Sequence, residues 1–318
     1  MQNLPPAFKG FLQADPGYVL VEMDKRQSEW VIVAYLSGDK RMIEIVESGV
    51  DPHAATAELI TKVPLWAIKQ ESSAIGHITD PEEIATIRES LVVTNKDISY
   101  SFKTLCSQLY AFLPRTMTCR QLGKKSNHAL NYMMGANKFS LISGLTVQEA
   151  EKVRTAYLRS YSGLHEWWRE VAHEVTTTGA VRNPFGQLRS FYGEVSETMY
   201  REAVATLPQS TSVYMVNRAM ILIYHDLSIS MHPVQLLGQG HDSILFQYPL
   251  ASIEDVENLQ RACQLAKEYM EPLIPWKGKF FRVQTDIKLG FSWDSGMTEC
   301  PVDSISYMAK SFLNNRIA

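Results

Sequence analysis

The order of apolar and polar positions along the chain predicts an α+β fold. Short apolar runs of strand length lie near both ends of the sequence, and longer helical patterns occupy its middle. Strands are expected at residues 18–24, 234–237, 244–248 and 281–288. Helices are expected at 83–92, 103–113, 118–134, 146–177 (one helix or two), 195–227 and 253–271, with residues 28–36 interpreted as helix or continued apolar core.

One tight turn carries polar residues between two of these strands, in the stretch GHDSILF at residues 240–246. Gly238 and Gly240 separate the two apolar runs, which predicts a short hairpin. His241 and Asp242 are then fixed at the turn. The ordinary alternative is a turn aspartate that hydrogen-bonds its own backbone, next to a surface histidine.

Composition restricts the partners and the compartment. The chain has 318 residues, 45% of them hydrophobic, which is enough for a sizeable core in one domain or two. The net charge of −3 gives no global basic character, although a local basic groove could still bind nucleic acid. The four cysteines lie far apart, so neither a zinc site nor a disulfide framework is indicated. No signal peptide and no membrane-spanning stretch is found, so we expect a cytoplasmic protein with no membrane partner.

Two carboxylates occupy similar positions in distant parts of the chain. Asp24 ends one apolar strand, and Asp242 lies at the predicted turn. If the two strands are neighbours, the carboxylates converge and offer hard oxygen ligands to a pair of Mg²⁺ ions. Such ions activate an attacking hydroxyl and stabilise a leaving pyrophosphate. The alternative for Asp24 is a strand-terminal residue that caps the next helix.

Four residues, two cations followed by an imidazole and a phenol, recur every four positions in the predicted helix at 118–134. Thr116 or Thr118 would cap this helix. The four residues are Arg120, Lys124, His128 and Tyr132. On a helix they form a slowly drifting stripe about 18 Å long, which is the reach of a bound nucleotide. Cations suit phosphate oxygens and a phenol suits stacking on a base. The alternative is the solvated face of an amphipathic helix.

Two further polar residues share a predicted helix. Arg201 and Gln209 lie eight positions apart, so both fall near one face of the helix at 195–227, in which Pro208 is expected to make a kink. Both side chains can reach groove edges or sugars of nucleic acid. Taken alone, they are better explained as two ordinary surface residues.

Taken together and in this order, these motifs resemble the A-family DNA polymerases, the group of bacterial DNA polymerase I and many phage replicative enzymes. The resemblance covers most of the chain. Its segments are MQNLP at the start, residues 15–39 (motif A, with Asp24, Gln27 and Glu29), DPHAATA at 51–57, RxxxKxxxHxxxY at 120–132 (motif B), RxxxxxxPQ at 201–209, GHDSILF (motif C) and FRVQTDIKLGFSW at 281–293.

The resemblance implies a right-hand architecture, with an antiparallel palm sheet and mainly helical fingers. We expect palm at 1–50 and 196–318, and fingers at 51–195. The gap of 67 residues between His53 and Arg120 is longer than in familiar members, which implies an insertion at about 62–112. Few residues precede motif A, so we expect no thumb and no 3′–5′ exonuclease, as in one half of a split polymerase or a truncated one.

The resemblance also implies a role for each site residue. Asp24 and Asp242 would hold two Mg²⁺ ions, with Mn²⁺ as an alternative. The expected catalytic and substrate-binding residues are Asp24, Asp242 and Lys124 for catalysis, His53, Arg120 and Lys124 for the triphosphate, His128 and Tyr132 near the insertion site, and Glu29 against a ribose 2′-hydroxyl. The expected primer–template contacts are Gln27, His241 (at the primer end), Arg201, Gln209 and Asn3.

The expected function is template-directed DNA synthesis, in which dNTPs are added to a primer 3′-hydroxyl in a bacterial or phage-infected cytoplasm. The expected partners are primer–template DNA, dNTPs and a separate fragment that carries the thumb and exonuclease. One alternative is a single-subunit RNA polymerase-like enzyme, which Glu29 opposes. Another is a degenerate module that binds DNA or a protein, which Ser243 favours because the family usually has a second carboxylate there. The retained Asp24 and Asp242 argue against that alternative.

Overall fold

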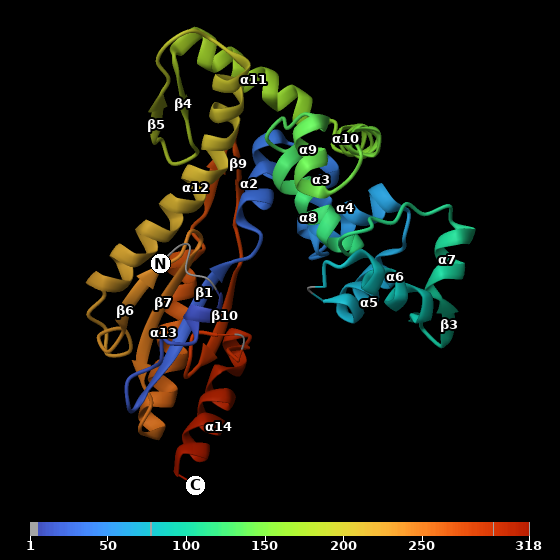
Figure 1. Ribbon diagram of the computed structural model, residues 1–318. Coiled ribbons are helices and arrows are strands. Elements are labelled where there is room, and N and C mark those ends of the chain that lie inside the picture. The colour runs from blue at the N-terminus through green and yellow to red at the C-terminus, as the bar shows by residue number, and fades with distance from the viewer. Residues whose placement is uncertain (1–5, 77, 295, 318) are drawn as a thin grey trace. The chain divides into compact units, whose positions relative to one another are not determined.

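The computed structural model describes residues 6–76, 78–294 and 296–317 (Figure 1). Its chain divides into two compact units. The first unit comprises Met1–Ile32, Arg182–Gln187 and Leu207–Ala318, and the second comprises Val33–Val181 and Leu188–Thr206. Of the helices in the described part of the chain, none is long and apolar enough to cross a membrane.

The first unit is built on a five-stranded antiparallel sheet with the strand order β11-β10-β1-β7-β6. Its strands are β1 (Tyr18–Lys25), β6 (Gln235–Gln239), β7 (Ser243–Pro249), β10 (Thr285–Gly290) and β11 (Thr298–Glu299). The remaining elements are α1 (Pro6–Lys9), α13 (Ile253–Met270), the hairpin β8 (Ile274–Trp276) and β9 (Lys279–Phe281), η1 (Val302–Ser304) and α14 (Ile305–Ile317). Two helices, α2 (Ser28–Ser37) and α12 (Glu197–His225), each contain residues of both units.

The two faces of this sheet differ in chemistry. Val19, Val21 and Met23 of β1 are buried in the main core, together with residues of α13 and α14, and Figure 1 shows these helices beside the sheet. Side chains alternate along a strand, so Glu22 and Asp24 face the other way. The apolar cluster on that second face is small. One face of the sheet therefore supplies the core, and the other presents polar groups.

The second unit is mainly helical. Its helices are α3 (Lys40–Glu47), α4 (Pro52–Thr61), α5 (Leu65–Ile75), α6 (Pro81–Ser90), α7 (Phe102–Gln108), α8 (Cys119–Leu130), α9 (Ala136–Ser143), α10 (Val147–Ser160) and α11 (Gly163–Thr178). Its small two-stranded pairs are β2 (Val92–Asn95) with β3 (Ile98–Ser101), and β4 (Ala180–Arg182) with β5 (Leu188–Ser190).

Helices α4 and α8 approach each other at backbone distance. A Cβ atom added to Gly123 of α8 would lie 2.0 Å from the carbonyl oxygen of His53 and 2.9 Å from the amide nitrogen of Ala57. Neither atom belongs to a side chain that could turn away. Glycine is therefore required at this crossing, which places His53 of α4 against the middle of α8.

The segment predicted to be an insertion folds into α5, α6, the β2–β3 hairpin and α7, and it fixes the start of α8. Glu71 of α5 is fully buried and forms an ion pair with Arg88 of α6. Its Oε2 accepts a hydrogen bond from the Cys119 amide at 2.9 Å, where the helix dipole favours a negative charge. Arg88 also donates to the carbonyl oxygen of Met117 at 2.9 Å. This segment thus supplies an acidic cap for the helix that carries motif B.

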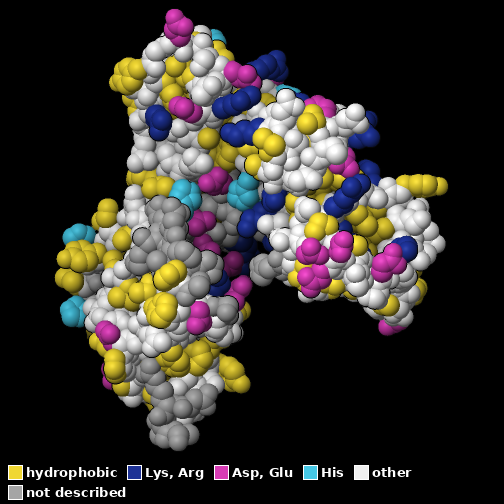
Figure 2. Space-filling model, viewed as in Figure 1, with side chains coloured by type: hydrophobic (Ala, Val, Ile, Leu, Met, Phe, Trp, Pro, Cys, Tyr) yellow, Lys and Arg dark blue, Asp and Glu magenta, His cyan; other side chains and the backbone are white. Residues whose placement is uncertain are grey.

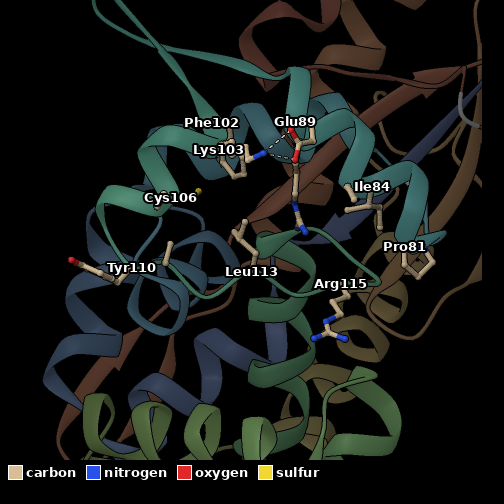
Figure 3. A pocket seen from close by; sticks show the side chains of 13 residues that line it. Pro81, Ile84, Glu89, Phe102, Lys103, Cys106, Tyr110, Leu113 and Arg115 are labelled. Carbon is tan, nitrogen blue, oxygen red and sulfur yellow. Dashed lines mark hydrogen bonds and ion pairs between the residues drawn. The ribbon is translucent and has the colours of Figure 1, made fainter.

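A cavity of about 640 Å³ lies in the same segment, between α6 and α7 (Figure 3). Ile84, Phe102 and Leu113 contribute apolar wall. Lys103 and Glu89 are paired beside it, at 2.7 Å between Nζ and Oε1. None of the site residues expected from the sequence lines this cavity, so it is separate from the site considered below.

Most of the predicted elements are present, and a few differ from the prediction. The pattern at 146–177, expected to form one or two helices, forms two, α10 and α11, whereas the strand expected at 281–288 is divided between β9 and β10. The helices expected at 83–92 and 103–113 appear as α6 and the shorter α7. Both helices border the β2–β3 hairpin, which the sequence did not predict.

The motif B helix is also shorter than predicted. It ends at Leu130, and Tyr132 lies in the turn that follows. Asn131 accepts a hydrogen bond from the Tyr157 hydroxyl at 2.7 Å and, through its carbonyl, one from Trp168 Nε1 at 3.0 Å. Met133 adopts a left-handed backbone with φ of 61°. These tertiary contacts and this backbone conformation end the helix, so Tyr132 does not continue the stripe.

The close crossing predicts the effect of enlarging Gly123. In Gly123→Ala the new methyl group must push α4 away from α8, so the free energy of unfolding should fall by about 3 kcal/mol. Urea denaturation followed by far-UV circular dichroism measures this change. Gly135→Ala is the matched control, because an added Cβ atom there meets nothing within 4 Å. Equal stability of the two variants would contradict the crossing described here.

Candidate active site

The two aspartates singled out in the sequence lie at one edge of the sheet. Asp24 is the penultimate residue of β1 and stands opposite Ser243 of β7 and Asp286 of β10. Asp242 precedes β7 directly, and its carbonyl oxygen accepts a hydrogen bond from the Lys25 amide at 3.0 Å. β1 and β7 are thus neighbours, which is the condition under which the two carboxylates converge.

Burial and neighbouring negative charge raise the pKa of both carboxylates. Burial, and after it the charges of Asp242 and Glu22, raise the pKa of Asp24 to about 7. Burial also raises the pKa of Asp242, against the lowering effect of His241. The Oδ1 atom of Asp24 is buried and has no hydrogen-bond partner within the described structure. One carboxylate oxygen at this edge of the sheet is therefore left without a partner in the described structure.

These features fit a divalent cation. In the described part of the chain, no group of three or more His, Cys, Asp or Glu side chains is arranged to hold a metal ion. Mg²⁺ does not need such a group, because it commonly takes one or two carboxylates and completes its shell with water and substrate phosphates. A cation beside Asp24 and Asp242 would satisfy the unpaired oxygen and relieve the repulsion. The residues present therefore fit Mg²⁺.

Two more carboxylates share this face, and each has a cationic partner. Asp286 accepts from Arg26 Nε at 3.0 and 3.1 Å. Glu22 accepts from Trp293 Nε1 at 2.7 Å and from Lys288 Nζ at 3.3 Å. The sequence analysis did not identify these residues. Alternating charges in the last strand were a signal, but only the strand register shows that they face Asp24.

Glu29 and His241, predicted to have separate roles, contact each other in the first unit. The His241 Nε2 and Glu29 Oε1 atoms are 3.3 Å apart. Glu29 lies in the first turn of α2, which begins after Gln27 in a left-handed backbone conformation with φ of 51°. Ser28 fixes this turn through a buried hydroxyl contact with Ser212 at 2.7 Å. The start of α2 and the motif C turn are thereby held together.

In the second unit, α8 presents the predicted cationic stripe. Lys124 and His128 are exposed and Arg120 is half-buried, whereas Leu122, Ser126 and other residues of the opposite face are buried. The Arg120 guanidinium pairs with Asp51, the N-cap residue of α4. Figure 2 shows Lys and Arg side chains gathered over this unit.

His53 joins this cationic face as a neutral group. Burial, and after it the charges of Arg120, His128 and Lys124, lower the pKa of His53 to about 3, against the raising effect of Asp51. Asn127 Oδ1 accepts from Thr56 at 2.9 Å, so its Nδ2 donates to His53 Nδ1 at 3.0 Å. The proton of the ring is then on Nε2.

The remaining predicted contacts are dispersed. Arg201 forms an ion pair with Glu197 within α12 and belongs to the second unit, whereas the exposed Gln209 belongs to the first. Asn3 lies outside the described residues. The structure thus groups Asp24 with Asp242, Glu29 with His241, and His53 with the stripe on α8.

Comparison with known proteins gives the family. The family model for DNA polymerase family A matches residues 94–295. The chain belongs to DNA polymerase family A. The thermostable DNA polymerase I of Thermus caldophilus is 24% identical over 286 residues, which cover 88% of this chain and 27% of that protein. The DNA polymerase of Mycobacterium phage D29 is 26% identical over 177 residues, 55% of this chain and 21% of that protein.

A solved family structure has a similar fold. The POL domain of Pol1 from M. smegmatis, solved in complex with DNA primer-template and dNTP, matches with a TM-score of 0.64 at 21% identity, over 93% of this chain and 44% of that one. The DNA polymerase I of Treponema pallidum is 23% identical over 81% of this chain and 22% of that protein. The chain thus spans about a quarter of the length of these curated family members.

The raised pKa of Asp24 predicts that replacing Asp24 increases the free energy of unfolding at high pH. Between pH 4 and 7 the folded chain holds a proton that the unfolded chain has lost, so the free energy of unfolding falls as pH rises through this window. Asp24→Asn does not titrate, and at pH 8 it should be about 2 kcal/mol more stable than the wild type. Chemical denaturation at pH 4 and pH 8 measures the difference.

Adding Mg²⁺ tests whether Asp24 holds a cation or is only destabilised by neighbouring negative charge. Millimolar Mg²⁺ should raise the melting temperature of the wild type at pH 8 and leave that of Asp24→Asn unchanged. Asp303→Asn, at an exposed position of the same unit, is the control and should respond as the wild type does. Equal responses of the wild type and Asp24→Asn to Mg²⁺ would show that Asp24 does not hold the ion.

Proposed function

We propose that this chain catalyses template-directed DNA synthesis by adding dNTPs to the 3′-hydroxyl of a primer. The observation that carries the proposal is the pair of half-buried carboxylates with raised pKa values, Asp24 and Asp242, in a chain that belongs to DNA polymerase family A. The fold relative from M. smegmatis was solved with primer-template and dNTP, which supports DNA and dNTP as ligands.

In the proposed reaction the primer 3′-oxygen forms a bond to the α-phosphorus of the dNTP, and the bond to pyrophosphate breaks. Asp24 and Asp242 would hold two Mg²⁺ ions, with Mn²⁺ as an alternative. When bound, these ions lower the pKa of the attacking hydroxyl and stabilise the charge of the leaving pyrophosphate. Arg26 and Lys288 hold the neighbouring carboxylates in place, so that Asp24 remains available as a ligand.

The triphosphate would bind to the cationic face of α8. Arg120 and Lys124 supply positive charge, and Lys124 is also the expected catalytic donor to the leaving phosphates. His53 supplies a neutral N–H whose protonation does not change near pH 7, because its pKa is about 3. His128 lies 5.7 Å from His53 between ring centroids and extends the face. Tyr132, in the turn beyond the helix, would stack near the insertion site.

Glu29 would select the sugar of the incoming nucleotide. Its carboxylate is held by the contact with His241 and by the fixed start of α2. A carboxylate held in this way would exclude a ribose 2′-hydroxyl. His241 would contact the primer end, and Gln27, Arg201 and Gln209 the primer–template.

The domain roles follow from these assignments. The sheet unit would be the palm, the helical unit the fingers, and the segment at about 62–112 an insertion that fixes the start of α8. A separate fragment with the thumb and exonuclease remains a prediction, which adding such a fragment to a primer-extension reaction tests.

Loss of Asp242 should abolish primer extension. With Mg²⁺, dNTPs and a primed template, Asp242→Ala should lower the rate at least about 1,000-fold, because one of two cation ligands is gone. Asp303→Ala, an exposed aspartate of the same unit, should retain the wild-type rate. Extension by Asp242→Ala at that rate would refute the proposed site. No extension by any protein, with a thumb-bearing fragment present, would favour a degenerate binding module.

Removal of the Glu29 side chain should relax sugar selection. Glu29→Ala should raise the rate of rNTP incorporation relative to dNTP incorporation by about 10-fold or more, because the 2′-hydroxyl gains room. His241→Ala is the paired variant, since it removes the same contact but keeps the Glu29 carboxylate, and it should relax sugar selection less than Glu29→Ala does. A preference of the wild type for rNTPs would instead identify an RNA polymerase-like enzyme.

A further inference from the structure

The β8–β9 hairpin of the first unit carries an alternation of aromatic and cationic residues. Its sequence from Pro275 to Phe281 reads PWKGKFF. The strands pair antiparallel, with Pro275 opposite Phe280 and Trp276 opposite Lys279. Lys277 and Gly278 form the turn with positive φ of 46° and 76°, as a tight hairpin turn of type I′ requires. The hairpin is therefore a well-defined small element.

The two faces of the hairpin differ in exposure. Ile274 and Phe281, which pair with each other, are buried. Phe280 points to the opposite face and is 67% exposed. Its ring adds little to the core, so the fold does not explain an aromatic residue at this position. Exposed rings beside cations are typical of surfaces that bind unpaired nucleic-acid bases.

A cavity of about 320 Å³ lies between the hairpin and the loop after β4. Three cations line it, Arg182, Lys277 and Lys279, and its lining includes no Asp or Glu. The chain as a whole has a net charge of −3, so this concentration of positive charge is local. Lys277 Nζ lies 5.9 Å from the centroid of the Trp276 ring, which helps to hold the ammonium group at the tip.

The loop that forms the other wall is fixed in place. Phe185 stacks on Tyr214 of α12 with 4.4 Å between ring centroids. Asn183 Nδ2 donates to Ser210 Oγ at 3.1 Å. Arg182 donates to the carbonyl oxygen of Gly186 at 2.6 Å, which orients its guanidinium within the loop. The cavity thus has two ordered walls.

The base of the hairpin is anchored at the carboxylate edge of the sheet. Lys25, the residue after Asp24, donates through Nζ to the carbonyl oxygens of Met270 and Val283, on either side of the hairpin. Lys25 also pairs with Thr285, where β10 begins. Six residues lead from Lys279 to Thr285, which limits their separation to about 20 Å. A DNA strand bound at the carboxylate pair would therefore lie within a few nucleotides of the hairpin.

We propose that the tip of the β8–β9 hairpin binds single-stranded DNA, with a base stacked on Phe280 and phosphates at Lys277, Lys279 and Arg182. An exposed ring favours unpaired bases, because bases within a duplex already stack on their neighbours. An acidic peptide could satisfy the cations, but it would leave the aromatic ring unused. The biological source of the strand, a template or primer, rests on the proposed polymerase function, whereas the binding itself does not.

Fluorescence anisotropy with labelled oligo(dT) tests the proposal on the full chain. Phe280→Ala should weaken binding about 10-fold, because one stacking contact is lost. Phe280→Trp should restore it. The double variant Lys277→Ala/Lys279→Ala should reduce the slope of log Kd against log salt by about 1.4, since two phosphate contacts are lost. Blunt-ended duplex of the same length should bind with an affinity that Phe280→Ala does not change.

Matched controls lie on α14 of the same unit. Tyr307→Ala removes an aromatic side chain that is 82% exposed, and Lys310→Ala removes an exposed lysine. Both should bind oligo(dT) as the wild type does. The proposal falls if Phe280→Ala binds as Tyr307→Ala does, or if polyglutamate displaces oligo(dT) as effectively as unlabelled oligo(dT).

Primer extension by the same proteins keeps the two proposals distinguishable. Extension that Asp242→Ala abolishes, together with unchanged oligo(dT) binding by Phe280→Ala, would refute the hairpin site and leave the polymerase function intact. Weakened binding by Phe280→Ala in a chain that extends no primer, even with a thumb-bearing fragment, would refute the polymerase function and support the hairpin site.

Discussion

Partial burial of Asp24 and the repulsion that Asp242 exerts on it form the constraint on which the candidate site of the first unit depends. Lys288 lowers the pKa of Asp24, but burial and the nearby carboxylates outweigh this effect; Lys288 is also paired with Glu22, and Arg26 with Asp286. Unpaired buried charge is costly, and a protein usually keeps it where a ligand will compensate it. The sheet bears this cost because its other face is covered by α13 and α14.

Strand alternation explains why the adjacent lysine does not relieve this repulsion. Lys25 follows Asp24 directly, yet its side chain turns to the opposite side and donates to backbone carbonyls near α13. Burial there lowers the pKa of Lys25 to about 7. Asp24 therefore contributes negative charge at the sheet edge, and Lys25 holds the segments on either side of the hairpin. The carboxylate edge and the β8–β9 hairpin share a single anchor.

In the second unit, a close helix crossing and a buried ion pair position the cationic face of α8. The close crossing of α4 and α8 at Gly123 places His53 beside the cations of α8. The buried Glu71 and Arg88 pair then holds the first turn of that helix. The segment of about fifty residues between these helices is thus a structural support for α8. The length of this segment predicts an insertion, and its contacts with the start of α8 show which helix it supports.

Local sequence patterns were enough to predict the α+β class, the positions of Asp24 and Asp242 beside strands, the polar stripe of Arg120, Lys124 and His128, and the resemblance to the family. These features depend on local periodicity and on residue types at fixed spacing, which the chain carries without its fold. Tertiary structure alone decided where α8 ends, that Glu29 meets His241, and that Asp286 faces Asp24. It also decided that Phe280 is exposed beside three cations. Strand register, helix crossings and burial bring together residues that are far apart in the chain, and no local pattern records such contacts.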